Sequence, residues 1–470
     1  MREFVFFGTG YRGKKLYKTF RHYGIEIKYW IDSDNEKWNK TLEGKYIYPP
    51  SRIEGEENIQ VCISAMDITR EMYQMVLGYG VPAGKIYTFY DALIYCVSHY
   101  FIKNKSDKTA EQKNIILDCF NGLGLGGVES WSMTLLKELR KEKYKAYLLS
   151  PYGEYNVENA IKESTLWLDL DKDKPLGWEN LENISKVIER MLPCVFVSGF
   201  VNDALLAACC IKMKYPERIR VISVIHQGLP AVYREYSYLN QYIDKYIAVS
   251  RDIQADMPEY GVQREKVLHM TCPVKCIEPY KRKYSLCGES PLKIGYAGRI
   301  ESIQKRLDCL MMIINELENL HTNYQMEIAG KGSYLEILKG EIKDSGLERK
   351  IHIVGEIKKA EIASFWSKQD VCINLSDFEG RSISIMEAMI NGAVPVVTDT
   401  SGIREDIEDR VNGYIVPVGD YTAMALKIHY LANHRELLEL YGKKSHEIMM
   451  QKGNVDFHMK FWKKVLQEAE

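Results

Sequence analysis

The sequence predicts an α/β protein built from parallel sheets and divided into about three domains. Its length of 470 residues is the first reason, because domains commonly contain about 100–200 residues. The second is that short apolar segments alternate with amphipathic ones, as parallel strands alternate with their connecting helices. The third is that several apolar segments end in glycine-rich turns. Ligands bind at such carboxyl ends of strands in parallel sheets.

The composition is ordinary for a globular protein, with 46% hydrophobic and 27% charged residues. An aromatic content of 11% excludes an extended disordered chain. The net charge of −1 gives no bulk attraction to nucleic acid, so we expect no nucleic-acid partner. The 11 cysteines include no C-x-x-C pair, which fits buried thiols in a reducing compartment. We therefore expect a cytoplasmic protein without a membrane-spanning helix.

The first unit, residues 1–105, begins with a strand at Phe4–Phe7, a glycine turn, a helix up to His22 and a second strand at Ile25–Ile31. This is the order of a Rossmann opening, in which glycines let a pyrophosphate approach a helix N-terminus. The candidate nucleotide-binding residues are Gly8, Gly10, Gly13 and Asp32. A third strand at Ile59–Ser64 and a helix at 68–79 follow, and polar residues 102–113 predict a linker.

The purpose of this first unit stays open between two interpretations. It resembles small Rossmann-like domains that precede sugar-modifying transferases and bind a nucleotide or nucleotide sugar. Alternatively, it is a degenerate domain used for docking or for dimerisation, which would make the protein a homo-oligomer. A single G-x-G-x-x-G motif is weak evidence and does not decide between them.

The second unit, residues 112–280, repeats the alternation of strand and helix. A glycine-rich loop at 121–127 separates its first strand from a helix at 128–140. We expect strands at Ile115–Leu117, Ala146–Leu149, Cys194–Ser198, Val221–Ile225 and Tyr246–Ser250. Parallel strands alternating with helices predict a doubly wound sheet.

The third unit, residues 288–454, has the same pattern. We expect strands at Lys293–Ala297, Met326–Ala329, Ile351–Val354, Val371–Leu375 and Val394–Thr398, with helices at about 306–320, 361–367 and 383–391. A last helix is expected within residues 455–470.

Two glutamates separated by seven residues, Glu379 and Glu387, are the clearest chemical pattern. The first follows a buried strand, and the second lies in the next helix, for which Ser382 is a natural N-cap. Amides at a helix N-terminus bind phosphate, and two acids beside them can accept hydrogen bonds from sugar hydroxyls. The spacing alone is more typical of two solvated acids beside an amphipathic helix.

The surrounding motifs favour the first interpretation. The run from Glu379 to Glu387, then Asn391-Gly392-Ala393-Val394-Pro395, Gly402-Ile403-Arg404-Glu405 and Asn412-Gly413-Tyr414, resembles retaining glycosyltransferases of the GT-B fold, in particular glycosyltransferase family 4 with its E-x7-E signature. Tyr296-Ala297-Gly298-Arg299 with Lys305-Arg306 is similar to that family's donor-phosphate motif. The resemblance spans residues 114–418. It implies two Rossmann-like domains, to which residues 1–105 add a third, smaller one. It also implies that the last helix, within residues 455–470, packs back on the second unit.

The resemblance implies a role for each matching residue. Arg299 and Lys305 neutralise the donor diphosphate, Glu379 contacts the transferred sugar, and Glu387 binds the ribose hydroxyls. Lys305 is followed by Arg306 where the family usually has glycine, so the local turn is expected to differ. Further donor contacts are expected around the phosphates, sugar and base, from Gly298, Gly355, Glu356, Gly380, Arg381, Ser382, Ile383 and Ser384.

Three residues of the second unit complete the expected site. His226 follows a strand, where in the family a histidine reaches the transferred sugar, although Gln227 stands where aspartate is common. On its own, a histidine at a strand end is more often structural. Gly126 and Gly127 resemble the family's N-terminal glycine motif, which lets a loop approach the diphosphate and the acceptor. Such glycine turns also have many purely structural uses.

The resemblance implies a retaining hexosyltransferase that uses a UDP- or GDP-sugar, without a required cofactor or bound metal. The acceptor is expected to be a glycan or a lipid-linked saccharide of a bacterial surface polysaccharide. A lipid-linked acceptor would bring the protein to the cytoplasmic face of the membrane, where Lys281-Arg282-Lys283 and Arg12-Gly13-Lys14-Lys15 are candidate basic patches. Two alternatives remain: a GT-B-fold nucleotide-sugar epimerase and a non-catalytic GT-B partner of another transferase. Intact donor residues argue against both.

Overall fold

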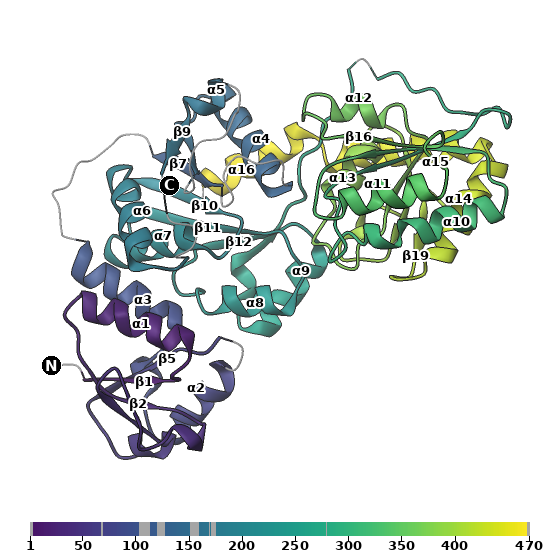
Figure 1. Ribbon diagram of the computed structural model, residues 1–470. Coiled ribbons are helices and arrows are strands. Elements are labelled where there is room, and N and C mark those ends of the chain that lie inside the picture. The colour runs from purple at the N-terminus through teal and green to yellow at the C-terminus, as the bar shows by residue number, and fades with distance from the viewer. Residues whose placement is uncertain are drawn as a thin grey trace.

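The computed structural model describes residues 3–66, 69–102, 113–119, 127–150, 159–168, 170, 175–278 and 280–467. Within these residues the strands form sheets of six, seven and six strands, one after another along the chain. All strand pairs in them are parallel apart from the short β3–β4 pair. The prediction of an α/β fold with parallel sheets is confirmed. We call the three parts the N-terminal module, the middle domain and the C-terminal domain (Figure 1).

The N-terminal module has the strand order β3-β4-β2-β1-β5-β6. Alternate side chains of β1 face opposite layers, as the pleat requires: Phe4 and Phe6 pack towards α1 and α3, while Val5 and Phe7 pack towards α2. Its elements are β1 (Glu3–Phe7), α1 (Tyr11–His22), β2 (Ile27–Ile31), β3 (Thr41–Leu42), β4 (Lys45–Tyr48), β5 (Ile59–Ile63), α2 (Thr69–Gly78), β6 (Ile86–Tyr87) and α3 (Phe89–Cys96).

The middle domain has the strand order β13-β12-β11-β10-β7-β8-β9. The strands expected from the sequence are present, and β9 and β13 extend the two edges. Its elements are β7 (Asn114–Asp118), α4 (Gly127–Lys141), β8 (Ala146–Ser150), α5 (Asn159–Lys162), β9 (Thr165–Trp167), α6 (Trp178–Arg190), β10 (Cys194–Ser198), α7 (Asp203–Lys214), β11 (Ile219–Ile225), α8 (Pro230–Ser237), β12 (Lys245–Ala248), α9 (Arg251–Asp256) and β13 (Val267–His269).

The C-terminal domain has the strand order β16-β15-β14-β17-β18-β19. The helix expected at about 306–320 starts later, because Leu307–Cys309 form a 3₁₀ turn before it. The elements are β14 (Leu292–Ala297), α10 (Leu310–Asn319), β15 (Tyr324–Ala329), α11 (Leu335–Asp344), β16 (Ile351–Gly355), α12 (Ile362–Trp366), β17 (Val371–Asn374), α13 (Ile383–Ile390), β18 (Val394–Thr398), β19 (Tyr414–Val416), α14 (Tyr421–Asn433), α15 (Glu436–Lys452) and α16 (Val455–Gln467).

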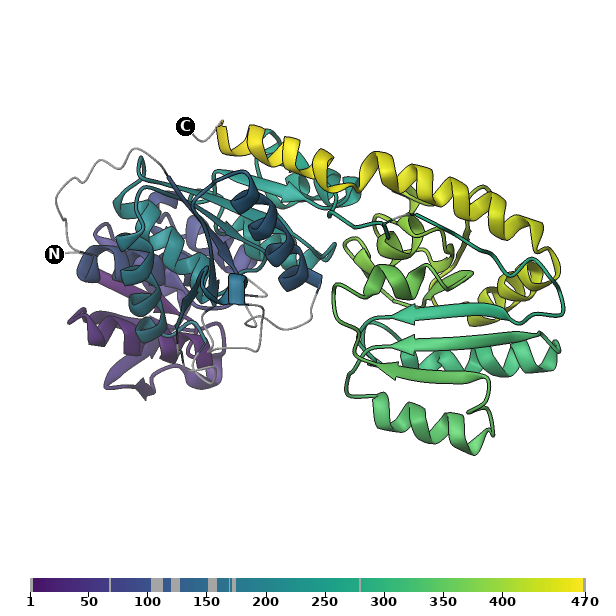
Figure 2. The ribbon, with the colours of Figure 1, turned by 90° about the horizontal axis from the view of Figure 1, so that it is seen from above.

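The last two helices connect the two larger domains (Figure 2). Met449 of α15 packs with Met386 and Met389 of α13 in the C-terminal domain. Trp462 of α16 belongs to the core of the middle domain and lies 5.9 Å from the ring of Trp131 on α4. The chain therefore returns to the middle domain after it has completed the C-terminal one.

The N-terminal module shares a continuous core with the middle domain. Phe20 of α1 and Leu93 of α3 belong to the same buried cluster as Leu205 of α7. Polar contacts add to this interface: the Tyr242 hydroxyl donates to Asp91 (3.0 Å), and the Tyr23 hydroxyl donates to Glu182 (3.0 Å). The module is therefore docked on the middle domain through α1 and α3. The linker expected at 102–113 lies almost entirely outside the described residues.

In each of the two candidate basic patches one cation is bound to another part of the chain, while Lys14, Lys281 and Lys283 are exposed. Arg282 is buried, pairs with Asp370 (3.7 Å) and donates to backbone carbonyls including that of Trp366 (3.3 Å). Lys15 donates to the backbone carbonyl of Pro175. In each run, one cationic side chain therefore bonds to another segment of the chain. None of the helices in the described part of the chain is long and apolar enough to cross a bilayer.

Candidate active site

The acid of the turn after β17, Glu379, is held by side chains from that turn and from β17. The Ser376 hydroxyl donates to Glu379 Oε1 at 2.8 Å, and Asn374 Nδ2 lies 3.5 Å from the same oxygen. Lys305 Nζ forms an ion pair with Oε1. Both partners of this pair are largely buried, with exposed side-chain fractions of 15% and 8%. Burial weakens screening by solvent, so the pair is stronger than one at the surface.

Lys305 belongs to the loop that follows β14, and Arg299 precedes it there. The Arg299 guanidinium is 57% exposed and donates to Glu301 (2.9 Å) and Gln304 (2.6 Å). Gln304 in turn donates to the Phe378 carbonyl (3.0 Å). The loop is therefore attached to the turn that carries Glu379, and it brings two cations to that turn.

Arg306 takes the left-handed conformation that glycine would favour, with φ of 52°. This costs a non-glycine residue roughly 1–2 kcal/mol. Its guanidinium pairs with Asp377 (2.9 Å) and Asp308 (3.2 Å), which offsets the cost. The turn after Lys305 is thus of the kind a Lys-Gly pair would form, although arginine replaces the glycine.

Glu387 lies one helical turn after Ser384 on the same face of α13, because residues three apart are neighbours on a helix. The Ser384 hydroxyl donates to the carbonyl of Ala297 at the end of β14 (2.5 Å), which directs this face towards the phosphate-motif loop. Glu387 Oε1 is 3.3 Å from Lys359 Nζ. We call Arg299, Lys305, Glu379 and Glu387 the donor cluster.

The start of α13 meets the middle domain at two close contacts. A Cβ atom added to Gly380 would lie 2.0 Å from the carbonyl oxygen of His226, so only glycine permits this approach. A Cβ atom on Gly127, the first residue of α4, would lie 3.5 Å from Cδ1 of Ile383. The N-termini of α4 and α13 therefore face the same region, and both favour an anion there.

Ser382 occupies the N-cap position of α13, as the sequence predicts, but its hydroxyl does not bond to the helix amides. It lies 3.3 Å from Asn374 Nδ2 instead. The first amides of α13 are thus left without a side-chain cap from Ser382. This arrangement suits a helix N-terminus that receives a ligand.

Arg381, expected to offer its amide to the donor, uses its side chain to tie the two domains together. The buried guanidinium makes a bidentate pair with Asp406 (2.5 and 3.0 Å), bonds Glu405 (2.9 Å), and donates to the Val249 carbonyl of the middle domain (3.2 Å). Burial would raise the pKa of Glu405, but a hydrogen bond from His269 and the charge of Arg381 lower it to about 2. Glu405 is therefore ionised at physiological pH, whereas burial raises the pKa of Asp406.

His226 lies at the end of β11 with its ring packed edge-to-face on Trp131 (5.3 Å between ring centres). Burial lowers the pKa of His226 to about 3, so the imidazole is neutral. Its Nε2 atom is buried and has no hydrogen-bond partner in the described part of the chain. A neutral imidazole nitrogen at this place can exchange a hydrogen bond with a sugar hydroxyl.

Residues expected near the nucleotide base and phosphates lie at the ends of β14, β15 and β16. The Gly355 carbonyl accepts from the Gly330 amide (2.8 Å), and Glu356 pairs with Lys331 (2.8 Å). A Cβ atom on Gly330 would lie 1.9 Å from the carbonyl oxygen of Gly298. The two glycine turns are therefore packed backbone on backbone beside the donor cluster. Gly126 lies outside the described residues.

Of the candidate residues of the N-terminal module, Gly8 and Gly10 lie in the turn between β1 and α1, Gly13 in the first turn of α1, and Asp32 directly after β2. A Cβ atom on Gly13 would lie 2.1 Å from the Gly8 carbonyl oxygen, which explains the glycine. Asp32 Oδ2 accepts from the Thr9 amide (2.9 Å) and the Thr9 hydroxyl (2.6 Å). Asp32 Oδ1 accepts from the amide of Asp34 (3.0 Å). Asp32 thus stabilises the turn between β1 and α1 as well as its own turn. Gly10 precedes α1 and, as glycine, offers no side-chain cap to it.

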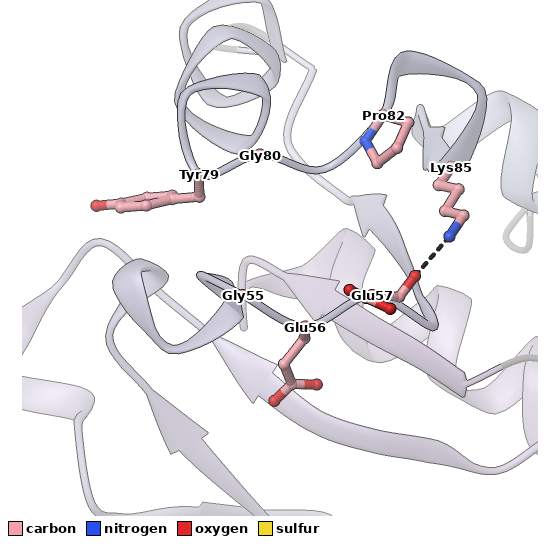
Figure 3. Close-up of a pocket in the computed structure, with 7 residues that line it drawn as sticks. All are labelled: Gly55, Glu56, Glu57, Tyr79, Gly80, Pro82 and Lys85. Atoms are coloured by element: carbon pink, nitrogen blue, oxygen red, sulfur yellow. Dashed lines mark hydrogen bonds between the residues drawn. The ribbon is translucent and has the colours of Figure 1, made fainter.

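A hollow of 300 Å³ lies elsewhere in this module, lined by Glu56, Glu57, Tyr79, Lys85 and their neighbours (Figure 3). Gly55–Glu57 precede β5 and Tyr79–Lys85 precede β6, so the hollow lies at the amino ends of these strands. Nucleotides bind doubly wound sheets at the opposite, carboxyl ends. We assign no nucleotide to it.

Several residues that hold the donor cluster in place were not singled out from the sequence. Asn374 and Ser376 interrupt the apolar end of β17 with polar side chains, a signal that the sequence does contain. Lys359 and Gln304 stand in polar loops that carry no comparable pattern. Only the structure brings them to Glu387 and to the turn of Glu379.

Known families match the two larger domains. Residues 280–447 match the family described as Glycosyl transferases group 1, and residues 125–275 match Glycosyltransferase Family 4. Among solved structures, HepE of Anabaena in complex with UDP and glucose aligns with a TM-score of 0.63 at 15% identity, covering 76% of this chain and 100% of HepE. The GT-B fold expected from the sequence is confirmed, and about a quarter of the chain has no counterpart in HepE.

Curated relatives match shorter stretches. The poly(ribitol-phosphate) alpha-N-acetylglucosaminyltransferase of Staphylococcus aureus is 28% identical over 159 residues, which are 34% of this chain and 32% of that protein. The amylovoran biosynthesis glycosyltransferase AmsK of Erwinia amylovora is 29% identical over 184 residues, 36% of this chain and 45% of AmsK. The chain therefore spans less than half the length of these relatives.

Proposed function

Because this chain belongs to the glycosyltransferases of the GT-B fold, we propose that it transfers a hexosyl group from a nucleoside diphosphate sugar to a saccharide acceptor, with retention of the anomeric configuration. The observation that carries the proposal is the meeting of two cations, two acids and two helix N-termini at one place. Lys305 contacts Glu379, and Gly380 beside it contacts the backbone of His226 in the other domain.

The donor diphosphate is assigned to the start of α13. Negative charge develops on the leaving diphosphate as the glycosidic bond breaks, and preorganised cations and amides stabilise that charge most in the transition state. Arg299 is exposed and can turn towards the phosphates, while Lys305 is already enclosed. These residues therefore act on the leaving group.

Two lysine–carboxylate pairs now occupy positions assigned to the sugar and the ribose. Glu379 is paired with Lys305, and Glu387 is paired with Lys359. When the donor binds, its hydroxyls take over hydrogen bonds to the two carboxylates, and the diphosphate takes over the lysines. The acids stay compensated in both states, which avoids the cost of a buried unpaired charge.

No side chain in this arrangement is assigned as a covalent nucleophile. Glu379 Oε1 is engaged by Lys305, Ser376 and Asn374, which suits a residue that orients a sugar. Retention then follows from attack by the acceptor on the face that the diphosphate leaves, with a donor phosphate oxygen taking the acceptor proton. The nucleotide is UDP or GDP.

The biological setting we propose is a bacterial surface glycan, extended at the cytoplasmic face of the membrane. The names of the relatives support it, since one glycosylates poly(ribitol-phosphate) and another takes part in amylovoran biosynthesis. The acceptor is then a glycan or a lipid-linked saccharide.

A panel of UDP- and GDP-sugars offered with simple glycosides tests the proposal. We expect one donor to give a transfer product whose anomeric configuration, read from the proton NMR coupling constant, equals that of the donor. An inverted product would contradict the retaining mechanism. Release of an epimerised sugar nucleotide without transfer would support an epimerase instead. If the protein neither turns over nor binds any of these donors, the result would support the alternative of a non-catalytic partner protein.

A further inference from the structure

The N-terminal module meets the middle domain at two places of different character. At the first, α3 packs against α7, and apolar residues of both helices share one buried core. At the second, polar groups of the module bind residues 238–242, the segment that joins α8 to β12. Apolar burial supplies most of the stability of such an interface, while hydrogen bonds add less but require a defined geometry. The second contact is therefore suited to fixing the position of that segment.

Asp91, in the first turn of α3, is the centre of the polar contacts. Its Oδ1 atom accepts from Gln241 Nε2 (2.7 Å) and from the Tyr242 hydroxyl (3.0 Å) of the middle domain. Its Oδ2 atom accepts from the amide (3.1 Å) and the hydroxyl (2.8 Å) of Thr88, the N-cap of α3. One oxygen thus completes the cap of α3, and the other holds the middle domain. Because the cap fixes the carboxylate, the module sets the position of Gln241 and Tyr242.

Tyr238 adds a contact directly after α8. Its hydroxyl donates to the carbonyl of Met66, which follows β5 of the module (3.3 Å). Backbone hydrogen bonds continue from α8 into the segment, since the Tyr238 amide donates to the Arg234 carbonyl (3.3 Å) and the Leu239 amide to the Tyr236 carbonyl (3.0 Å). The segment and the helix are thus one continuous piece. The module therefore holds the C-terminal end of α8 through both α3 and the residues after β5.

The rest of α8 lies at the candidate active site. The helix begins at Pro230, four residues after His226. Val232 and Tyr236 of the helix line a hollow of 120 Å³ together with His226, on the sugar and acceptor side of the site. The helix has eight residues, so its two ends lie only about 12 Å apart. A shift of its C-terminal end therefore moves the side chains that line the site.

One face of α8 is buried in the middle domain and the other is exposed. Tyr233 and Tyr236 are buried, whereas Ala231 and Arg234 are exposed. The helix therefore lies on the surface of its domain, beside the N-terminal module (Figure 1). A helix this short depends on packing for its stability, and the module supplies contacts at its C-terminal end.

We propose that the N-terminal module braces α8: by holding residues 238–242 through Asp91 and the Met66 carbonyl, it keeps the acceptor side of the active site in the position that transfer requires. Asp91, Gln241 and Tyr242 are positioning residues, which act on the acceptor through α8 without touching it. The proposal rests on the proposed transferase function and goes beyond it, because it gives the module a role in the reaction that needs no ligand bound to the module.

Two tyrosines of the same interface give a matched pair of variants. Tyr242 and Tyr23 each donate one hydrogen bond of 3.0 Å across it, Tyr242 to Asp91 and Tyr23 to Glu182 of α6, away from α8. With phenyl glucoside as the acceptor probe, Tyr242→Phe should raise the acceptor KM at least fivefold and leave the Kd for UDP unchanged. Tyr23→Phe should change neither constant, although urea unfolding should show a similar loss of stability in both variants.

A double variant, Gln241→Ala/Tyr242→Phe, removes both hydrogen bonds to Asp91 Oδ1 and should raise the acceptor KM at least tenfold. An acceptor KM that this variant leaves unchanged would overturn the proposal. An equal rise in Tyr23→Phe and Tyr242→Phe would also overturn it, because the module would then act only through general stability. If the double variant fails to fold, as circular dichroism would show, the comparison of the two single variants decides.

Hydrogen exchange of residues 230–237, followed by mass spectrometry of the full chain, separates the brace from the transferase function. We expect faster exchange in Tyr242→Phe than in the wild type, and no change in Tyr23→Phe. This result in a protein that neither binds UDP nor transfers a sugar would retain the contact that holds α8 and contradict the transferase. Sugar transfer with exchange and acceptor KM unaffected by any of these variants would retain the transferase and contradict the brace.

Discussion

Two turns of this molecule join a buried strand to a helix and place an acid beside glycines, yet the acids are used differently. In the N-terminal module, Asp32 accepts hydrogen bonds from the Thr9 amide and hydroxyl, in the turn after β1, and from the Asp34 amide in its own turn. It also pairs with Lys37 (3.3 Å). In the C-terminal domain, Glu379 and Glu387 are each paired with a lysine side chain. Backbone amides cannot leave their carboxylate without unfolding the turn, whereas a lysine can rotate away. Backbone amides thus hold Asp32 in addition to its lysine, whereas the hydrogen bonds to Glu379 and Glu387 in the described part of the chain come from side chains. We therefore expect Glu379 and Glu387 to exchange their partners for those of a ligand more readily than Asp32.

The loss of Lys305 should have the largest effect on the donor side. Lys305→Ala removes a cation from the leaving diphosphate and leaves Glu379 without its ion-pair partner. Removing one preorganised group of this kind lowers kcat by about 100- to 1,000-fold. Steady-state transfer with the best donor of the panel measures it.

Lys339→Ala is the matched control for that variant. Lys339 pairs with Glu336 on the surface of α11 in the same domain (2.8 Å), and exposed pairs contribute little. Its turnover should equal that of the wild type. A kcat of Lys305→Ala equal to that of the wild type would contradict the proposal that Lys305 binds the diphosphate.

The two turns also differ in the contact that an added methyl group would disrupt: a contact between domains at one turn and a contact within the turn at the other. Gly380→Ala places a Cβ atom against the His226 carbonyl of the middle domain, so the two domains must shift apart. Misplacement of reacting groups by about 1 Å can cost 100-fold in rate, and we expect a fall of that order in kcat/KM. Circular dichroism and thermal unfolding should remain close to those of the wild type, since the clash lies between domains. A fully active Gly380→Ala protein would show that this contact is not needed for turnover.

The corresponding change in the N-terminal module should affect stability rather than catalysis. Gly13→Ala places a Cβ atom against the Gly8 carbonyl inside one turn, and overpacking of this kind costs about 1–3 kcal/mol. Urea unfolding should show the loss. Gly10→Ala, where a Cβ atom meets nothing within 4 Å, is the matched control. Equal stabilities of the two variants would contradict the close packing of this turn.

The smallest expected effect is a pH dependence from Asp32. Burial would raise its pKa, but hydrogen bonds from Thr9 and Asp34 and the charge of Lys37 lower it below the ordinary value. The unfolded chain therefore takes up the proton at a higher pH than the folded one. The stabilisation by Asp32 is complete above about pH 4 and is lost as the pH falls through the folded-state pKa. Asp32→Asn should lose less unfolding free energy than the wild type between about pH 5 and pH 3.

The sequence predicts most of this fold because buried parallel strands are short apolar runs that turn residues delimit. Cys194–Ser198 and Val394–Thr398 are such runs, and their predicted bounds agree with β10 and β18. The start of α10 predicted from the sequence is too early. Arg306 adopts a left-handed conformation, which cannot be predicted from an arginine. The sequence does not predict the docking of the N-terminal module on the middle domain. The apolar residues of α1 and α3 have the same spacing whether a helix face covers its own sheet or a second domain.

The candidate site could be proposed from the sequence where a motif fixes the position of a side chain along the chain. Glu379, Glu387 and Arg299 are of this kind. The partners of these acids could not be predicted, because Lys305 meets Glu379 across 74 positions and Lys359 meets Glu387 from a separate loop. The role of Asp32 was open for the same reason. Its partners are the Thr9 hydroxyl, two backbone amides and Lys37, and the geometry of two turns decides which of them reach the carboxylate.

Calorimetric titration of UDP and GDP into the wild type, Glu387→Ala and Asp32→Asn tests the central claim most directly. That claim is that the nucleotide binds at the donor cluster and not at the turn of the N-terminal module. It predicts one equivalent of one nucleotide bound by the wild type, the same Kd in Asp32→Asn, and an affinity at least tenfold weaker in Glu387→Ala. Unchanged binding in Glu387→Ala, or binding lost in a folded Asp32→Asn protein, would contradict it.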